Sequence, residues 1–368
     1  MKAFRRLALW TTAATYFLVF AGGLVRVSGA GLGCPDWPKC FGRWIPPTSL
    51  SQLPPGIDPS AFNVTLAWIE YFNRLAGMTV GLLILGVAIL AIRHFRKNPR
   101  VLYPSLAAAL LVAYQGWQGS NVVASGLEPF IVTIHMVTAL VIASLMIYAT
   151  VESYSASDSG ASAPPDFPGY TRRLMVGLWV ATVVQIIFGS QVRQGLEVAA
   201  RQLPQSTPQE WFARVGTLKD LHLMLGVLVA LLTLYEGMAV LRSEGGRQPI
   251  VRQTIWAMLL LVFLQAGLGL VLLVTGLPAV TDLFHLWFAA LYVGLLLVLL
   301  TVVRRPRALV AQWERGSTKR AAAIILVVVL MGVGSWWVIT QAHESRQPVQ
   351  TRVSLPAPDA NLRVEGPC

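Results

Sequence analysis

Charge is what this sequence has least of. Asp, Glu, Lys and Arg together make up 12% of its 368 residues, whereas hydrophobic residues make up 55%. The surface of a soluble protein needs about a quarter of its residues to be charged. A chain of this length and composition cannot cover soluble domains, so we expect a membrane protein that crosses the bilayer several times.

The charges that are present are mostly positive, with 29 Lys and Arg against 17 Asp and Glu. A net charge of +12 could also indicate nucleic-acid binding. That function needs the basic residues on one face or tail, and here they lie in short loops between apolar runs. The pattern is typical of positive-inside topology, so we predict the lipid bilayer as a partner and no nucleic acid.

Apolar runs long enough to cross a bilayer, at roughly 20 residues each, predict nine helices. They occupy residues 7–27, 67–92, 101–124, 130–151, 174–192, 220–241, 253–275, 283–303 and 321–340. The distribution of Lys and Arg places the N-terminus in the cytoplasm together with the loops at 93–100, 152–173, 242–252 and 304–320.

The first eight predicted helices form two similar halves. The matching positions are Gln115-x3-Gly119 with Gln265-x3-Gly269, Gly126-Leu127 with Gly276-Leu277, His135 with His285, Val25-Arg26 with Val192-Arg193, and Asn73 with His222. Because each half has an even number of helices, both insert in the same orientation, as a parallel repeat. We therefore predict an all-α membrane protein of two pseudo-symmetric four-helix transmembrane bundles plus one additional C-terminal transmembrane helix.

The predicted domain boundaries follow from this repeat. Residues 1–151 form the N-terminal half, and 152–173 form a cytoplasmic linker rich in Ser, Ala and Pro. Residues 174–303 form the C-terminal half. Residues 304–368 hold a basic cytoplasmic loop, the ninth helix and an outer tail.

Three of the five histidines, His135, His222 and His285, fall within apolar runs near their outer ends. An ionisable residue inside a membrane helix is costly and indicates a functional site. Zinc usually needs Cys or carboxylate ligands beside His, and no such cluster lies at these helix ends. Imidazoles from facing helices of a four-helix bundle suit the axial positions of a heme instead.

The two halves differ in their predicted heme ligands. His222 and His285 would form a bis-His site in the second half, which suits electron transfer. The first half offers His135, but Asn73 stands where its partner should be, and an amide is a poor iron ligand. A heme there would keep one open face, where oxygen chemistry can occur.

Charged residues near the histidines are further candidates. Arg26 and Arg193, expected at matching outer helix ends, would bind heme propionates, although each could equally be an interfacial, snorkelling arginine. Glu70 lies one helical turn before Asn73 and could transfer protons at the open iron face. Arg74 would instead make it an ordinary i, i+4 ion pair, and spacing alone leaves both readings open.

Two of the three cysteines, Cys34 and Cys40, lie in the first outer loop. Outside the cytoplasm, two nearby cysteines can form a disulfide. The pair could be a structural staple or redox-active, and Cys368 has no predicted role.

The run from Gly22 to Cys40 resembles the first helix end and outer loop of heme A synthases. Ile69-Glu70-Tyr71-Phe72-Asn73-Arg74-Leu75 is similar to their Glu-x-x-His-Arg motif, and His135, His222 and His285 match their histidines. The resemblance covers residues 1 to about 303. It implies oxidation of the C8 methyl of heme O to a formyl group, which gives heme A for terminal oxidases.

The resemblance also implies roles for residues. His222 and His285 would ligate heme b, His135 would ligate the substrate heme O, and Glu70 would serve the oxidation. Asn73 and Arg74 would join the cofactor-binding residues, and Cys34 and Cys40 would form the loop pair. The implied setting is a bacterial inner membrane, with the Cys loop outside and with heme O synthase and terminal oxidase assembly as partners. A homo-oligomer is left open.

The sequence departs from the family at three points. Asn73 replaces a histidine, Leu223 follows His222 where some members carry an arginine, and the helix at 321–340 is an addition. Two alternatives therefore stay open. One is a non-catalytic heme b electron-transfer protein of the cytochrome b561 type, and the other is a transporter built from parallel repeats.

Overall fold

The computed structural model describes residues 1–155, 167–304 and 317–346, and within these ranges the chain is helical without a β-strand. The helices are α1 (Lys2–Val27), α2 (Val64–Phe95), α3 (Pro99–Ala124), α4 (Pro129–Ser155), α5 (Thr171–Gln202), α6 (Pro208–Val215), α7 (Thr217–Arg242), α8 (Pro249–Thr275), α9 (Ala279–Arg304) and α11 (Ser317–Glu344). Short 3-10 turns lie at Ala30–Leu32, Leu50–Gln52, Pro59–Ala61 and Glu244–Arg247.

A long helix lies over each of the nine predicted segments, but α5 ends at Gln202 rather than at residue 192. Arg193 therefore lies inside α5, so its predicted place at a helix end is wrong. The extension is stabilised because Leu196 and Ala199 are buried and Glu197 pairs with Arg193 across one turn. The short helix α6 was not predicted, because its eight residues, only four of them hydrophobic, give no long apolar run.

Seven helices in the described residues are long and apolar enough to cross a membrane: α1, α2, α4, α5, α7, α8 and α9. The chain is accordingly a multi-pass membrane protein. Helix α3 is long enough but not apolar enough, because polar side chains, among them Gln115, Gln118 and Asn121, interrupt its outer half. The eight-plus-one arrangement thus stays a prediction.

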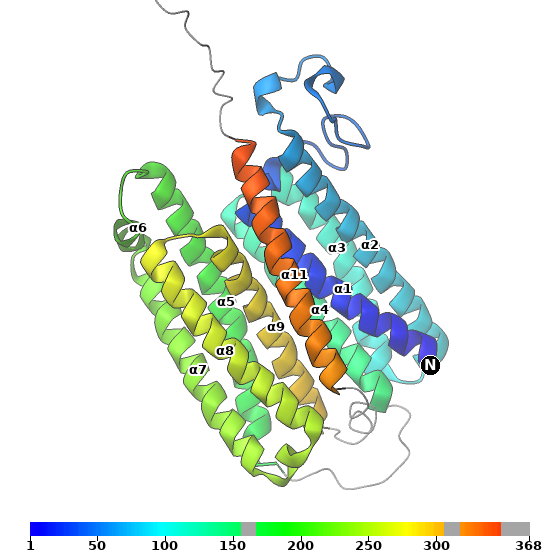
Figure 1. The fold of residues 1–368 in the computed structure, drawn as a ribbon. Coiled ribbons are helices and arrows are strands. Elements are labelled where there is room, and N and C mark those ends of the chain that lie inside the picture. Colours follow the sequence, from blue (N-terminus) through cyan, green and yellow to red (C-terminus); the bar gives the residue numbers. More distant parts are fainter. Residues whose placement is uncertain (156–166, 305–316, 347–368) are drawn as a thin grey trace, which may run out of the picture.

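The long helices pack as two rings of four (Figure 1). In the first ring α2 and α4 each pack against α1 and α3, so that α2 and α4 lie on one diagonal. In the second ring α7 and α9 each pack against α5 and α8, and again form a diagonal. Helix α9 joins the rings by packing against α1 and α4, and α11 lies across α9, α1 and α2.

Each ring has its own apolar core. Phe4, Ile84 and Met146 are among the buried residues of the first, and Met175, Ile255 and Leu296 are among those of the second. Large apolar side chains also remain exposed on the outer faces, such as Leu110 and Phe263, at 74% and 75% exposure. Such faces are expected where lipid is the solvent.

The two ends of the bundle differ. The N-terminus of α1 lies at one end, and the long loop between α1 and α2, helix α6 and the end of α11 lie at the other (Figure 1). This second end also holds the sites described next, because the predicted histidines lie near it.

Candidate functional site

His222 of α7 is oriented by its neighbour in α5. Its Nδ1 lies 3.1 Å from the carbonyl oxygen of Gln185, and the side chain of Gln185 donates back to the carbonyl of His222 at 2.8 Å. An Nδ1–H that is bound to a backbone carbonyl leaves Nε2 with its lone pair, which is how a metal-ligating histidine is usually held.

His135 of α4 is held in a related way. The side chain of Gln115 in α3 donates to its carbonyl oxygen at 2.8 Å. Within the described part of the chain, Nδ1 of His135 is buried without a hydrogen-bond partner, whereas the imidazole of His285 in α9 lies beside the backbone of Gln265. A buried polar atom without a partner is uncommon and indicates a missing ligand, ion or water.

A glycine faces each of the three imidazoles. A Cβ added at Gly189 would lie 2.7 Å from Cε1 of His222, and one at Gly269 would lie 3.4 Å from Cε1 of His285. A Cβ at Gly119 would lie 3.7 Å from Cε1 of His135. The imidazole rings therefore lie close to the backbone of a neighbouring helix. At position 189 only glycine leaves enough space for the ring of His222.

The helices that carry the histidines lie on the ring diagonals. His222 and His285 come from α7 and α9, which face each other across the second ring. Asn73 and His135 come from α2 and α4, which face each other across the first ring. The amide oxygen of Asn73 is buried, and no described residue is its hydrogen-bond partner.

The donor set fits a heme. Imidazoles on facing helices of a four-helix bundle, each with a glycine beside the ring, fit the axial ligation of a planar macrocycle. No group of three or more His, Cys, Asp or Glu that could hold a bare metal ion occurs among the described residues. The first ring offers one imidazole and the second offers two.

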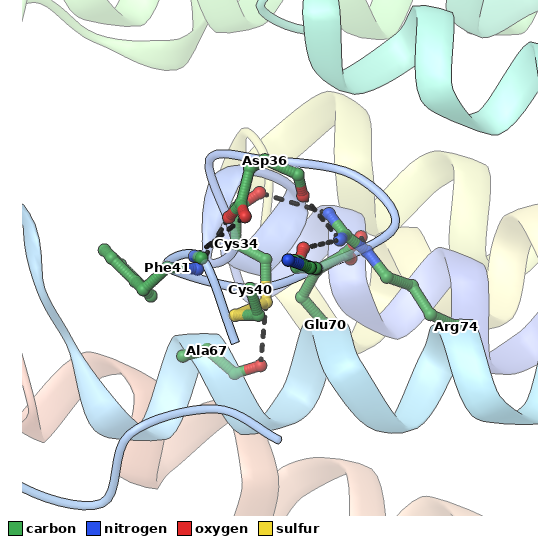
Figure 2. Close-up of a disulfide and its surroundings, with 9 residues drawn as sticks. Cys34, Asp36, Cys40, Phe41, Ala67, Glu70 and Arg74 are labelled. Atoms are coloured by element: carbon green, nitrogen blue, oxygen red, sulfur yellow. Dashed lines mark hydrogen bonds and ion pairs between the residues drawn. A yellow bond between two sulfur atoms is a disulfide. The ribbon is translucent and has the colours of Figure 1, made fainter. Parts of the chain in front are cut away.

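Glu70 and Arg74 form the ion pair that the spacing allowed, with Arg74 Nε donating to Glu70 Oε1 at 2.9 Å (Figure 2). Glu70 is 6% exposed. The remaining guanidinium nitrogens of Arg74 donate to loop carbonyls, those of Cys34 at 3.1 Å, Asp36 at 2.7 Å and Lys39 at 2.9 Å. Arg74 thus binds the Cys loop onto α2, with Glu70 as its counter-ion.

Cys34 and Cys40 form a disulfide and are both buried. Within the same loop the carboxylate of Asp36 accepts hydrogen bonds from the backbone N–H groups of Phe41 at 2.6 Å and Gly42 at 2.8 Å (Figure 2). These bonds close the loop into a compact unit directly outward of Glu70.

Arg193 is engaged by carboxylates. It donates to Asp282 in α9 and, at 3.1 Å, to Glu197 in its own helix. Arg26, at the end of α1, forms no ion pair among the described residues, yet it lies in the electrostatic field of Arg193, Asp282 and Glu197. The structure therefore brings the two predicted arginines together at the junction of the rings.

Roles for Gln185, Asp282 and the Gln-x3-Gly pattern of α5 were not predicted from the sequence. The signal was present, because Gln185-x3-Gly189 repeats the spacing of Gln115-x3-Gly119 and Gln265-x3-Gly269. In α1 the equivalent position of the repeat holds Leu18, four residues before Gly22. The first ring thus lacks this glutamine as well as the histidine that stands opposite it.

A family model described as a cytochrome oxidase assembly protein, COX15-CtaA, matches residues 5–297. The chain belongs to this family. Proteins named heme A synthase are similar to it, from Shouchella clausii at 25% identity and from Bacillus licheniformis at 26%. These alignments cover 83% of this chain and 99% and 98% of the relatives.

A third heme A synthase, from Shewanella oneidensis, is 32% identical over 136 residues, or 36% of this chain and 40% of its own length. Membership in the heme A synthase family makes the chain a membrane oxidoreductase.

Proposed function

We propose that the chain is a heme A synthase that oxidises the C8 methyl of heme O to a formyl group. The observation that carries this proposal is the placement of His135, His222 and His285 on the helices that face each other across the rings. The second ring presents His222 and His285 on one diagonal, and the first presents His135 opposite Asn73. The named relatives and the family match support the same reaction.

The residues have separate roles in this proposal. His222 and His285 would hold heme b, and His135 would hold the substrate heme O. The bound heme supplies the oxidation chemistry, and the protein supplies ligation, orientation and proton management. Gln185 and Gln115 fix the backbones that carry His222 and His135.

Glu70 is the proposed proton-handling residue. The bond from Arg74 uses its Oε1, which leaves Oε2 to accept or release a proton. Arg74 keeps this carboxylate in place and ties it to the Cys loop, so the loop covers the outer side of the first ring. We assign Cys34 and Cys40 to this structural role.

The proposed architecture has residues 1–151 and 174–303 as repeated halves of four crossings each, including α3, with α11 as the addition. The N-terminus lies in the cytoplasm of a bacterial cell and the Cys loop on the outer side of the inner membrane. Heme O synthase is the enzyme expected to supply the substrate, and terminal oxidase assembly is expected to use the product.

The test is production of heme A. The chain is expressed together with a heme O synthase in cells without a heme A synthase of their own, and membrane hemes are extracted and separated by chromatography. Heme A should appear with the wild-type chain and be lost with His135→Ala, while heme b remains bound. Unchanged heme O beside a heme-b-loaded protein would rule the reaction out.

Asn73 favours one second candidate, a heme b electron-transfer protein that has lost the reaction. Asn73→His distinguishes the two. If one axial ligand suffices, the added imidazole closes the open face, so heme A yield should not rise and the low-spin heme signal should grow. Heme A that appears with Asn73→His but not with the wild type would show instead that the wild-type chain has lost the reaction.

A further inference from the structure

The end of α11 docks onto the outer part of the first ring. The guanidinium of Arg346 donates from Nη2 to the carbonyl of Ser28, and the side chain of Asn63 donates to the carbonyl of Ser345 at 3.0 Å. Asn63 is also the N-cap of α2. Gly29 has a φ of +67°, a backbone conformation that favours glycine, and the guanidinium of Arg346 lies directly against it.

This contact brings Arg346 into a cavity of about 540 Å³ at the junction of the two rings. Its lining comes from the end of α1, the loop that follows, the start of α2, the outer part of α5 and the end of α11. The charged residues that line it are Arg26, Arg193, Arg201, Arg346 and Glu197.

The cavity has an excess of positive charge. Glu197 pairs with both Arg193 and Arg201, and Asp282 pairs with Arg193. Among the described residues, Arg26 has no ion pair, and Arg346 has only the neutral carbonyl of Ser28. Two guanidinium charges are therefore left for a ligand, and guanidinium groups bind carboxylates through paired, charge-assisted hydrogen bonds.

The cavity also lies above the proposed substrate position. Leu66, which lines it, is followed on the same face of α2 by Glu70 after four residues and Asn73 after seven. At 1.5 Å per residue, Asn73 is about 10 Å inward of Leu66 along the helix. A flat ligand bound by His135 could thus extend its polar edge outward into the cavity.

We propose that Arg346 and Arg26 bind the two propionate carboxylates of the heme held in the first ring, so that the added helix α11 completes the substrate site. The inference rests on the proposed function for the identity of the ligand. The inference adds two points to the proposed function. Helix α11 contributes a binding residue, and the substrate is recognised at a second place, away from the iron.

The test is a binding measurement that needs no turnover. The full chain, purified with heme b from cells that make no heme O, is titrated with heme O and with heme O dimethyl ester in the absence of an electron donor. The wild type should bind heme O about tenfold or more tightly than the uncharged ester. In Arg346→Gln that preference should fall several-fold, because heme O binds more weakly when Arg26 alone remains to bind a propionate, with the affinity for the ester unchanged.

Two further variants separate charge from structure. Arg346→Lys keeps the charge and should restore part of the preference, whereas Arg252→Gln removes an exposed arginine at the start of α8 and should change nothing. An equal loss for heme O and its ester in Arg346→Gln would show that Arg346 only docks α11, and would overturn the proposal. A wild type without preference for heme O over the ester would also overturn it.

A lipid phosphate is the competing anion. The titration is therefore repeated in phosphatidylcholine nanodiscs with and without phosphatidylglycerol. The proposal expects no effect of phosphatidylglycerol on heme O affinity. Competition that disappears in Arg346→Gln would assign the cavity to lipid headgroups instead. Absence of heme A in the expression test, with the preference for carboxylates intact, would reject the reaction and leave this binding site standing.

Discussion

Glycines decide how closely the histidines approach their neighbouring helices. A glycine inside a helix costs about 1 kcal/mol relative to alanine, yet Gly119, Gly189 and Gly269 all lie in helix interiors and all face an imidazole. The cost is offset because the ring can lie against the neighbouring backbone, which fixes its plane. Of the three contacts, that of Gly189 with His222 leaves the least space.

Gly189→Ala should therefore displace His222. The added Cβ would lie 2.7 Å from the ring, so the imidazole must move and its Nδ1 bond to Gln185 must weaken. We expect heme b content per protein to fall several-fold, measured by the pyridine hemochrome assay. Gly267→Ala in α8, where a Cβ meets nothing within 4 Å, should keep full heme b and unfold no more easily than the wild type. Normal heme b in Gly189→Ala would contradict the assigned role of the glycine.

At the scale of single residues, the sequence predicted the histidines because an ionisable group in an apolar run is conspicuous. It did not predict Arg346, because an arginine after a helix end has no local signal for what it will contact. The pairing of Glu70 with Arg74 was one of two equal readings, since i, i+4 spacing gives proximity but not the loop carbonyls that Arg74 also binds.

At the scale of elements, the Cys loop and α2 form one unit. Arg74 reaches from the helix to three loop carbonyls, and its charge is balanced inside the protein by Glu70. The side chain of Arg74 is 13% exposed. Removing one partner of a buried ion pair leaves the charge of the other without compensation, which typically lowers the free energy of unfolding by about 3–5 kcal/mol.

Arg74→Gln should release the loop from α2. Trypsin cleaves after Lys39 and Arg43, which are exposed but lie in a chain held rigid by the Arg74 bonds. We expect cleavage in this loop to become several-fold faster on a reducing gel. Arg93→Gln, an exposed arginine in the last turn of the same helix, provides the control and should cleave at the wild-type rate. An unchanged rate in Arg74→Gln would mean that the disulfide alone holds the loop.

The positions of the long helices were predictable because a bilayer demands long apolar runs, and these runs are the strongest periodic signal in the chain. The residues at which the helices end were less predictable. Helix α5 continues past its apolar run because Glu197 forms an ion pair with Arg193 and because the side chains of Leu196 and Ala199 are buried. Helix α6 is held by local contacts such as that of Trp211 Nε1 with the carbonyl of Leu203, and the turn at Glu244–Arg247 is capped by Ser243. Such contacts leave little trace in hydropathy.

At the scale of the whole molecule, the two rings carry the apolar cores and α11 lies outside them. The core clusters of the rings consist of residues from α1–α5 and α7–α9, within or next to the matched range 5–297. Helix α11 instead packs across α9, α1 and α2 and is fastened at its end by Asn63 and Ser28. It is an addition to a fold that is complete in its cores.

A chain that stops after residue 304 should therefore still hold heme b. Without α11 the bonds from Asn63 and Arg346 are lost, so trypsin should cut the Cys loop faster than in the full chain. The heme b content per protein, measured by the pyridine hemochrome assay, should equal that of the wild type within experimental error. Loss of heme b on truncation would place α11 within the fold itself, because contacts such as that of Val328 and Met331 with the cluster around Trp287 would then be essential.

The direction of α11 has a consequence for how the protein meets its surroundings. Helix α1 begins at one end of the bundle, and α11 finishes at the other, beside the Cys loop (Figure 1). With the N-terminus in the cytoplasm, as we propose, α11 would end on the outer side of the membrane. A reporter fused after residue 368 should be reachable by antibodies on intact spheroplasts, whereas the same reporter fused before Met1 should be hidden until the membrane is opened.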